Sequence, residues 1–139
     1  FEDIAFEVIG ATIAYPRIGA EVTLSGYGCL ESGGQDANFG VLNVGTAVVT
    51  RRPVGDDIDT VTQGGAALCF GDSGGAAYFT TNRGGARIII GVNSRGNIST
   101  RSWLSTTATP LFVDWAVEWA AQRQVTICGL HVEATGCRS

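Results

Sequence analysis

Apolar and polar residues alternate along much of this chain, with the period of two that is typical of a half-buried strand. The clearest case is the segment 20–28, "AEVTLSGYG", in which Val22 and Leu24 fall on one face and polar residues on the other. Apolar, β-branched segments predict further strands at 4–14, 41–50, 76–81 and 86–94, the last two forming a hairpin. Glycine-rich or charged stretches predict turns at 30–40, 51–59 and 82–85.

The pattern changes near the end of the chain. In residues 110–124, apolar side chains recur at helical spacing, which predicts one amphipathic helix with a packing face of Phe112, Trp115, Ala116, Trp119 and Ala120. Glycine makes up 20 of 139 residues, against about 7% in an average protein, and favours a turn-rich β fold. Many short strands and a single terminal helix predict an all-β class, an antiparallel barrel or sandwich rather than a βαβ sheet.

Composition excludes several classes of function. The chain is 45% apolar, which is enough for a folded domain. A net charge of -4 with nine basic residues provides no basic patch for nucleic acid. We find no apolar run of about 18 residues, so no membrane span is expected. The N-terminus shows no signal-peptide pattern. A mature chain from which a signal peptide had been removed would look the same.

Four cysteines, an even number, permit two disulfides in three connectivities. Their spacing does not match a zinc site, so neither a metal nor a cofactor is expected. Disulfides are favoured over buried thiols, and they indicate an oxidising location, secreted, extracellular or periplasmic.

A candidate nucleophile lies in "LCFGDSGGAAYF" at 68–79, where Ser73 is surrounded by glycines. A serine nucleophile needs a base, usually a histidine, and the one histidine, His131, comes 58 residues later. The stretch also satisfies G-x-S-x-G, the nucleophile elbow of α/β-hydrolases, for which Asp114 and His131 would complete the order of the triad. That alternative is disfavoured, because a strand-like segment follows the serine and the chain is short for a parallel sheet.

Five segments, in order, resemble the chymotrypsin-like serine proteases. They are "DIA" at 3–5, "LSGYG" at 24–28, "CFGDSGG" at 69–75, "GVNSRG" at 91–96 and "FVDWAVEWAA" at 112–121. The resemblance covers roughly residues 2–121 and is closest to bacterial secreted members. It implies the second antiparallel β-barrel of the two-barrel fold, with the C-terminal helix that closes it.

The resemblance also implies roles for individual residues. Ser73 would be the nucleophile, and the backbone N–H groups of Gly71 and Ser73 would form the oxyanion hole. Asp72 would pair with a new N-terminus released on activation. Asp3 would orient the catalytic histidine.

The family's histidine lies upstream of the triad aspartate, in the first barrel, and His131 in the tail is a poor substitute. Three hypotheses follow: a two-chain serine endopeptidase whose partner carries the first barrel and the histidine, an inactive protease-like binding module, or a fragment of a single-chain enzyme. We expect the first, with a protein or peptide substrate.

The resemblance places the substrate-binding residues at Ala67, Leu68, Phe70, Ser94, Arg95 and Gly96. Ala67, at the pocket floor, lacks the carboxylate that cleavage after arginine or lysine requires. A medium or small apolar residue before the scissile bond is therefore expected. Arg95 replaces an aromatic residue of the family and would favour acidic groups in the substrate.

Because Cys29 directly follows "GYG", as in some bacterial members, the resemblance pairs Cys29 with Cys69 and leaves Cys128 with Cys137. It also divides the chain into an aspartate segment and connector at 1–19, a barrel with its helix at 20–123, and a disulfide-closed tail at 124–139. The resemblance does not extend to this tail.

Overall fold

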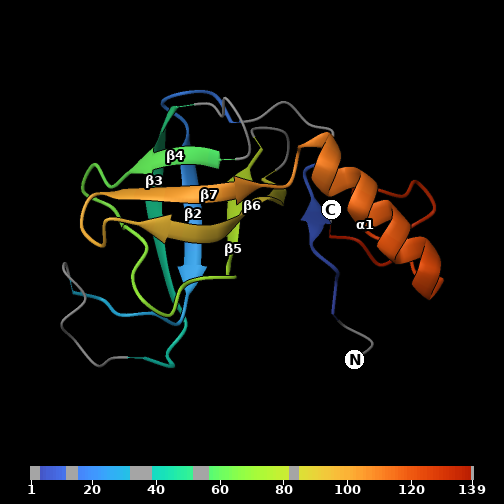
Figure 1. Ribbon diagram of the computed structural model, residues 1–139, viewed down its shortest axis with the longest axis horizontal. Helices are drawn as coiled ribbons and strands as arrows, with labels where there is room; N and C mark the ends of the chain where they lie inside the picture. The colour runs from blue at the N-terminus through green and yellow to red at the C-terminus, as the bar shows by residue number, and fades with distance from the viewer. Residues whose placement is uncertain (1–3, 12–15, 32–38, 52–56, 82–84, 139) are drawn as a thin grey trace.

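The computed structural model spans residues 1–139, and the structure describes all of them except 1–3, 12–15, 32–38, 52–56, 82–84 and 139 (Figure 1). Seven strands precede one helix. The strands are β1 (Val8–Ile9), β2 (Glu21–Gly26), β3 (Asn43–Arg51), β4 (Asp57–Val61), β5 (Ala76–Thr80), β6 (Arg87–Gly96) and β7 (Arg101–Thr106), and the helix is α1 (Pro110–Arg123).

Six strands close into an antiparallel barrel. Their order is β6-β5-β2-β3-β4-β7, and β7 pairs back onto β6 to complete the ring. The long strand β6 makes this possible, because residues 87–92 pair with β5 and residues 91–96 pair with β7. Ile88 and Ile89 also pair in parallel with β1, which lies outside the ring. The predicted all-β class and barrel are thereby confirmed.

The barrel core follows from the alternation along each strand. On β2, for example, Val22 and Leu24 are buried and their neighbours are more exposed. The core cluster consists of Val22, Leu24, Ala47, Val49, Ile58, Leu68, Ala77, Ile88, Ile90 and Leu104. Every strand of the closed barrel contributes to it, so burial of this apolar surface is the main force that closes the ring.

Two segments differ from their predicted structure. The charged turn predicted at 51–59 is wrong from Asp57 onward, because these residues begin β4, in which Ile58 and Thr60 are 1% exposed. The outward carboxylates of this strand concealed its alternation. Strand β7 was not predicted, because Ser102 and Thr106 place hydroxyl groups on its buried face. Within the described part of the segment 4–14, the strand structure consists of β1 and a single bridge residue, Phe6.

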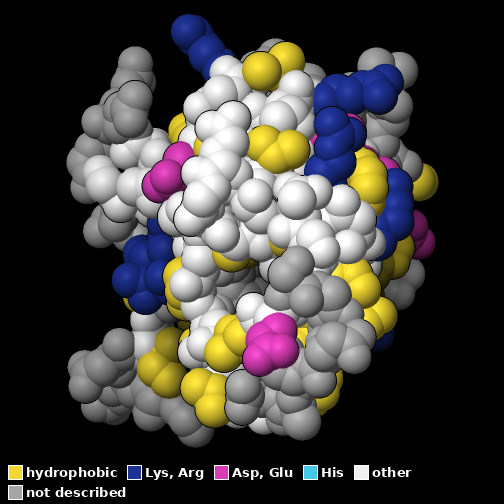
Figure 2. All heavy atoms as spheres, turned by 90° about the vertical axis from the view of Figure 1, so that its left-hand side faces the viewer, with side chains coloured by type: hydrophobic (Ala, Val, Ile, Leu, Met, Phe, Trp, Pro, Cys, Tyr) yellow, Lys and Arg dark blue, Asp and Glu magenta, His cyan; other side chains and the backbone are white. Residues whose placement is uncertain are grey.

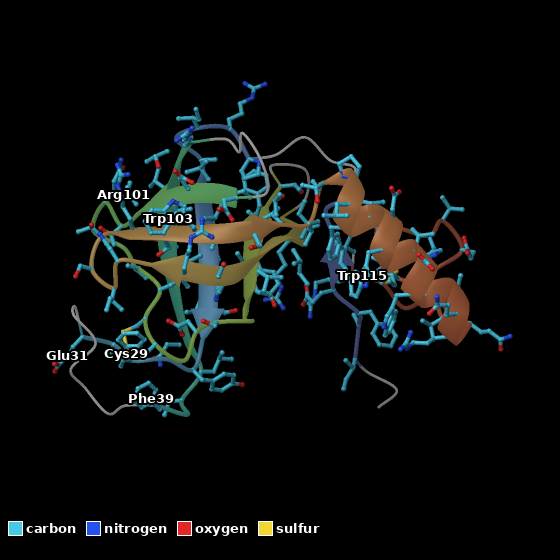
Figure 3. All side chains as sticks on the ribbon, viewed as in Figure 1. Cys29, Glu31, Phe39, Arg101, Trp103 and Trp115 are labelled. Atoms are coloured by element: carbon cyan, nitrogen blue, oxygen red, sulfur yellow. A yellow bond between two sulfur atoms is a disulfide. The ribbon has the colours of Figure 1, made fainter. Side chains whose placement is uncertain are left out.

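The terminal helix is confirmed, and both of its ends are capped. The Thr109 side chain accepts a hydrogen bond from the Phe112 N–H at 3.2 Å, and Pro110 occupies the first turn. The predicted packing face is only partly correct: Ala116 and Ala120 are buried, but Trp115 is 57% exposed. Figure 3 shows Trp115 on α1, at the opposite end of the molecule from Cys29 and Phe39.

Candidate active site

The candidate nucleophile lies in the loop 69–75, which leads into β5. Ser73 is exposed on this loop. The loop is anchored to β6 through backbone hydrogen bonds from Gly74 N–H to the Asn93 carbonyl at 2.9 Å and from Asn93 N–H to the Gly75 carbonyl at 2.8 Å. The barrel therefore holds the loop on both sides of Gly75, and the serine projects from a fixed turn.

The Asp72 carboxylate points inward from the same loop. One oxygen accepts the Gly28 N–H and the other accepts the Cys69 N–H, each at 2.8 Å. Hydrogen bonds to a charged acceptor are stronger than neutral ones. Asp72 thus joins the loop to the segment after β2, which is the "SGYG" motif of the sequence.

Glycines of that motif give the carboxylate its room. A Cβ on Gly26 would lie 2.0 Å from Asp72 Oδ1, and one on Gly28 would lie 2.7 Å from the same oxygen. No side chain fits at either position. The two glycines of "SGYG" are therefore needed so that Asp72 can reach its partners.

Three amide groups of the loop, those of Phe70, Gly71 and Ser73, have no hydrogen-bond acceptor among the described residues, and the last two belong to the proposed nucleophile and the residue two positions before it. The N–H groups of Asp72, Gly74 and Gly75 donate to backbone carbonyls, whereas those of Gly71 and Ser73 donate to no carbonyl of the described residues. Gly71 has a φ of +94°, and a Cβ there would lie 3.1 Å from Gly28 Cα. Glycine allows this left-handed conformation. The pair of unengaged donors beside an exposed hydroxyl is an arrangement that can bind a developing oxyanion.

Asn93 is a site residue that sequence reasoning missed. It is 2% exposed, and its Nδ2 donates to the Ser25 carbonyl at 2.8 Å and to the Asp72 carbonyl at 3.2 Å. Its Oδ1 is a buried atom without a hydrogen-bond partner among the described residues. The signal was available, because an amide at an inward position of the apolar strand "RIIIGVNS" needs a polar partner.

A disulfide ties the same two segments together. Cys29 and Cys69 are bonded, with 5.4 Å between their Cα atoms, and the Cys29 N–H donates to the Phe70 carbonyl at 3.0 Å. A second disulfide joins Cys128 to Cys137 in the tail. Both pairs are those that the resemblance implied.

Of the predicted substrate-binding residues, Leu68, Arg95 and Gly96 are hydrogen-bonded to or paired with β7. The Leu68 N–H donates to the Ser102 hydroxyl at 2.8 Å, and Gly96 lies opposite Ser102 in the β6–β7 pairing. Leu68, however, is 6% exposed and belongs to the core cluster, whereas Phe70 is 60% exposed. Buried Ser102 therefore fixes the segment 67–70 relative to the strand that carries Ser94, Arg95 and Gly96.

Arg95 has partners of its own. Its guanidinium forms an ion pair with Asp57 on β4 and lies 5.6 Å from the centre of the Trp103 ring. The hydrogen bond to Asp57, more than any other contact, raises the pKa of Arg95. Because Asp57 already neutralises this charge, the structure does not favour the expected preference for acidic substrate groups.

The histidine and the aspartates considered for the triad lie away from Ser73 or outside the described residues. His131 lies in the tail, where its Nδ1 accepts the Ile127 N–H at 2.9 Å. Asp114 is exposed on α1, and Asp3 lies outside the described residues. Thus none of the described residues places an imidazole at Ser73.

A cavity of about 350 Å³ opens beside the loop. Its walls include Leu24, Gly28, Asn43, Leu68 and Asp72. Figure 2 views the end of the barrel that carries these loops and shows hydrophobic side chains gathered toward its lower part. Within the described residues, no cluster of three or more histidine, cysteine or acidic side chains could hold a metal, and no helix is long and apolar enough to cross a membrane.

A family model for trypsin matches residues 6–116, which include the barrel, the loop with Ser73 and the first half of α1. The chain belongs to the trypsin family. The chymotrypsin-like resemblance and the barrel fold are thereby confirmed. The members of this serine protease family are enzymes that act on peptides. No curated protein matches the chain.

Proposed function

We propose that this chain is the nucleophile-bearing part of a serine endopeptidase. Ser73 attacks the scissile carbonyl, and the N–H groups of Gly71 and Ser73 stabilise the oxyanion that forms. The observation that supports this most directly is that the N–H groups of Gly71 and Ser73 donate to no carbonyl of the described residues, whereas those of Asp72, Gly74 and Gly75 do.

The base comes from a segment outside this chain. The one histidine of the sequence is held in the tail by the Ile127 N–H. We propose that a first-barrel segment supplies the imidazole, which takes the proton of Ser73 and returns it to the leaving amine, while Asp3 orients it.

An apolar surface near the loop is suited to receive that segment. Its exposed large side chains are Tyr27, Leu30, Phe39, Val41, Leu42, Val44 and Phe70. Phe39 lies next to the oxyanion loop, since a Cβ on Gly71 would be 3.2 Å from its ring. Large apolar side chains exposed in the segments beside this loop are suited to contact with another segment.

Asp72 has capacity for one further partner. Its two N–H bonds use two of the roughly four acceptor positions of a carboxylate, and it lines the cavity of about 350 Å³. We propose that a processed N-terminal amine enters this cavity and binds Asp72. Two disulfides support a secreted or other oxidising location.

The test is denaturing intact-mass analysis of the complete protein after treatment with a fluorophosphonate probe, with and without reductant. An adduct on Ser73, its loss in Ser73→Ala, and a second chain that contains histidine are the expected results. A longer single labelled chain would make the enzyme a single-chain one. An unreactive species near 14.5 kDa would contradict the enzyme and favour a binding module.

A further inference from the structure

The tail, residues 127–138, lies outside the family match, yet it contacts the start of the chain. Two contact points are spaced along the N-terminal segment, residues 4–9. At one, the Ile9 N–H donates to the Cys128 carbonyl at 2.9 Å. At the other, the Phe6 N–H donates to the Gly136 carbonyl at 2.8 Å.

The disulfide connects these two points. The carbonyl of Cys128 is the first acceptor, and Cys137 lies opposite Phe6 in a parallel bridge. The Arg138 N–H donates to the Phe6 carbonyl at 2.8 Å and extends this bridge. The Cys128–Cys137 bond closes the loop between them. The tail therefore binds the N-terminal segment at two points, which are the two ends of the loop that the Cys128–Cys137 disulfide closes.

The N-terminal segment also has the barrel on another side. Val8 and Ile9 pair with β6, and the Gly10 N–H donates to the Ile89 carbonyl at 2.7 Å. The segment thus lies between β6 and the tail. Figure 1 shows β1, the tail and α1 at the same end of the molecule.

The fit at Ile9 is close. Gly129 has a φ of +91°, and a Cβ there would lie 2.1 Å from the Ile9 carbonyl oxygen. That oxygen belongs to the backbone, so it cannot move aside as a flexible side chain does. A glycine is required where the tail crosses Ile9.

Charge reinforces the contact. Glu7 forms ion pairs with Arg87 on β6 and with Arg138 in the tail, the latter with 2.9 Å between Nε and Oε1. One carboxylate therefore links the barrel, the N-terminal segment and the tail. The hydrogen bond from Arg87, followed by the charges of both arginines, lowers the pKa of Glu7 against the opposing effect of desolvation.

From these contacts we infer that the tail is a positioning clamp, which holds residues 4–9, the segment that directly follows the proposed triad aspartate Asp3 in the sequence, and acts on the aspartate through that connection. This inference rests on the proposed role of Asp3. The clamp touches neither substrate nor Ser73; it acts through the aspartate. Opening it lowers the turnover rate rather than substrate affinity, because a misplaced aspartate no longer orients the base.

The first measurement is hydrogen exchange of the Phe6 and Ile9 amides in the complete protein. The double variant Cys128→Ser/Cys137→Ser, and separately Gly129→Ala, should exchange these amides at least about tenfold faster, since each opens the clamp locally. Gly129→Ala keeps the disulfide, so it still tests the clamp if the double cysteine variant does not fold. The control is Gly19→Ala, with a φ of +87° but no heavy atom within 4 Å of the new Cβ.

The second measurement is a double-mutant cycle on kcat and KM with Asp3→Asn. Each clamp variant should lower kcat by about tenfold with KM within about twofold, and should cause no further loss in the Asp3→Asn background. Unchanged exchange, or an equal loss of kcat in both backgrounds, would overturn the inference. An inactive parent protein would instead overturn the proposed function, and with it the role of the clamp, whatever the exchange shows.

Discussion

The nucleophile loop and the tail clamp are both glycine-containing segments held by a disulfide, but the two disulfides join cysteines at very different separations in the sequence. The loop's disulfide spans 40 residues, and the side chains of the half-buried Asp72 and the buried Asn93 add bonds to segments far away in the chain. The tail's disulfide spans nine residues, and its other contacts are backbone bonds and exposed ion pairs.

This difference indicates how each segment is stabilised. The loop is connected to β2, β6 and the segment after β2, so it opens only when the barrel itself is disturbed. The described tail residues contribute nothing to the core cluster of the barrel, so local opening there has a lower free-energy cost. The proposed catalytic geometry thus combines a rigid nucleophile with an aspartate whose placement depends on a separable clamp.

The largest expected effect is on the oxyanion donors. Gly71→Ala should lower the rate of Ser73 labelling by a fluorophosphonate about 10²–10³-fold, because the peptide turns its N–H away to relieve the positive φ. Gly19→Ala is the control, since it carries similar backbone strain, about 1–2 kcal/mol, in open space. Equal labelling of both variants would contradict a role for the Gly71 N–H.

Removing each disulfide sharpens the comparison of the two regions. By loop-closure entropy, Cys29→Ser/Cys69→Ser should lower the free energy of unfolding by about 4 kcal/mol. Cys128→Ser/Cys137→Ser should lower it by about 2.5 kcal/mol, because its loop is shorter. Urea unfolding followed by tryptophan fluorescence measures both values. A larger loss for the tail pair would mean that the clamp stabilises the barrel as a whole.

Asp72→Asn tests whether the loop depends on its inward carboxylate. The amide offers one acceptor oxygen, so either the Gly28 or the Cys69 N–H faces an NH₂ group and loses its partner. We expect a loss of about 2–3 kcal/mol in the free energy of unfolding, together with slower labelling of Ser73. Asp114→Asn, on the exposed face of α1, should change the free energy of unfolding by no more than about 0.5 kcal/mol and leave the rate of Ser73 labelling unchanged.

The smallest effect concerns Glu7 in the clamp. Its pKa is lower in the folded than in the unfolded chain, so its stabilising contribution is present above the unfolded value and disappears as pH falls through the folded one. Glu7→Gln should flatten this part of the dependence of stability on pH, below about pH 4.5. The effect is under about 1 kcal/mol, because Arg87 and Arg138 are 46% and 44% exposed. A variant with an unchanged acid slope would mean that these ion pairs contribute nothing.

Much of the fold was predictable because its signals are local. Alternation identified β2, apolar and β-branched segments on either side of a glycine-containing turn identified the β5–β6 hairpin, and helical spacing identified α1. Strands β4 and β7 were missed, since outward carboxylates on one and inward hydroxyls on the other weaken the apolar pattern. Their strand character depends on mutual pairing, which a single segment of sequence does not display.

At the site, the sequence by itself determined the residue types: a serine between glycines, an acid beside it, and two glycines in "SGYG". Only the tertiary structure decided why those glycines are there, because the approach of Asp72 to Gly26 and Gly28 joins segments 44 residues or more apart. It likewise decided that Asn93 supports the loop, that Asp57 neutralises Arg95, and that the tail grips the N-terminal segment. Periodicity and motifs are properties of neighbours in the chain, whereas each of these contacts is made by residues that only the closed barrel brings together.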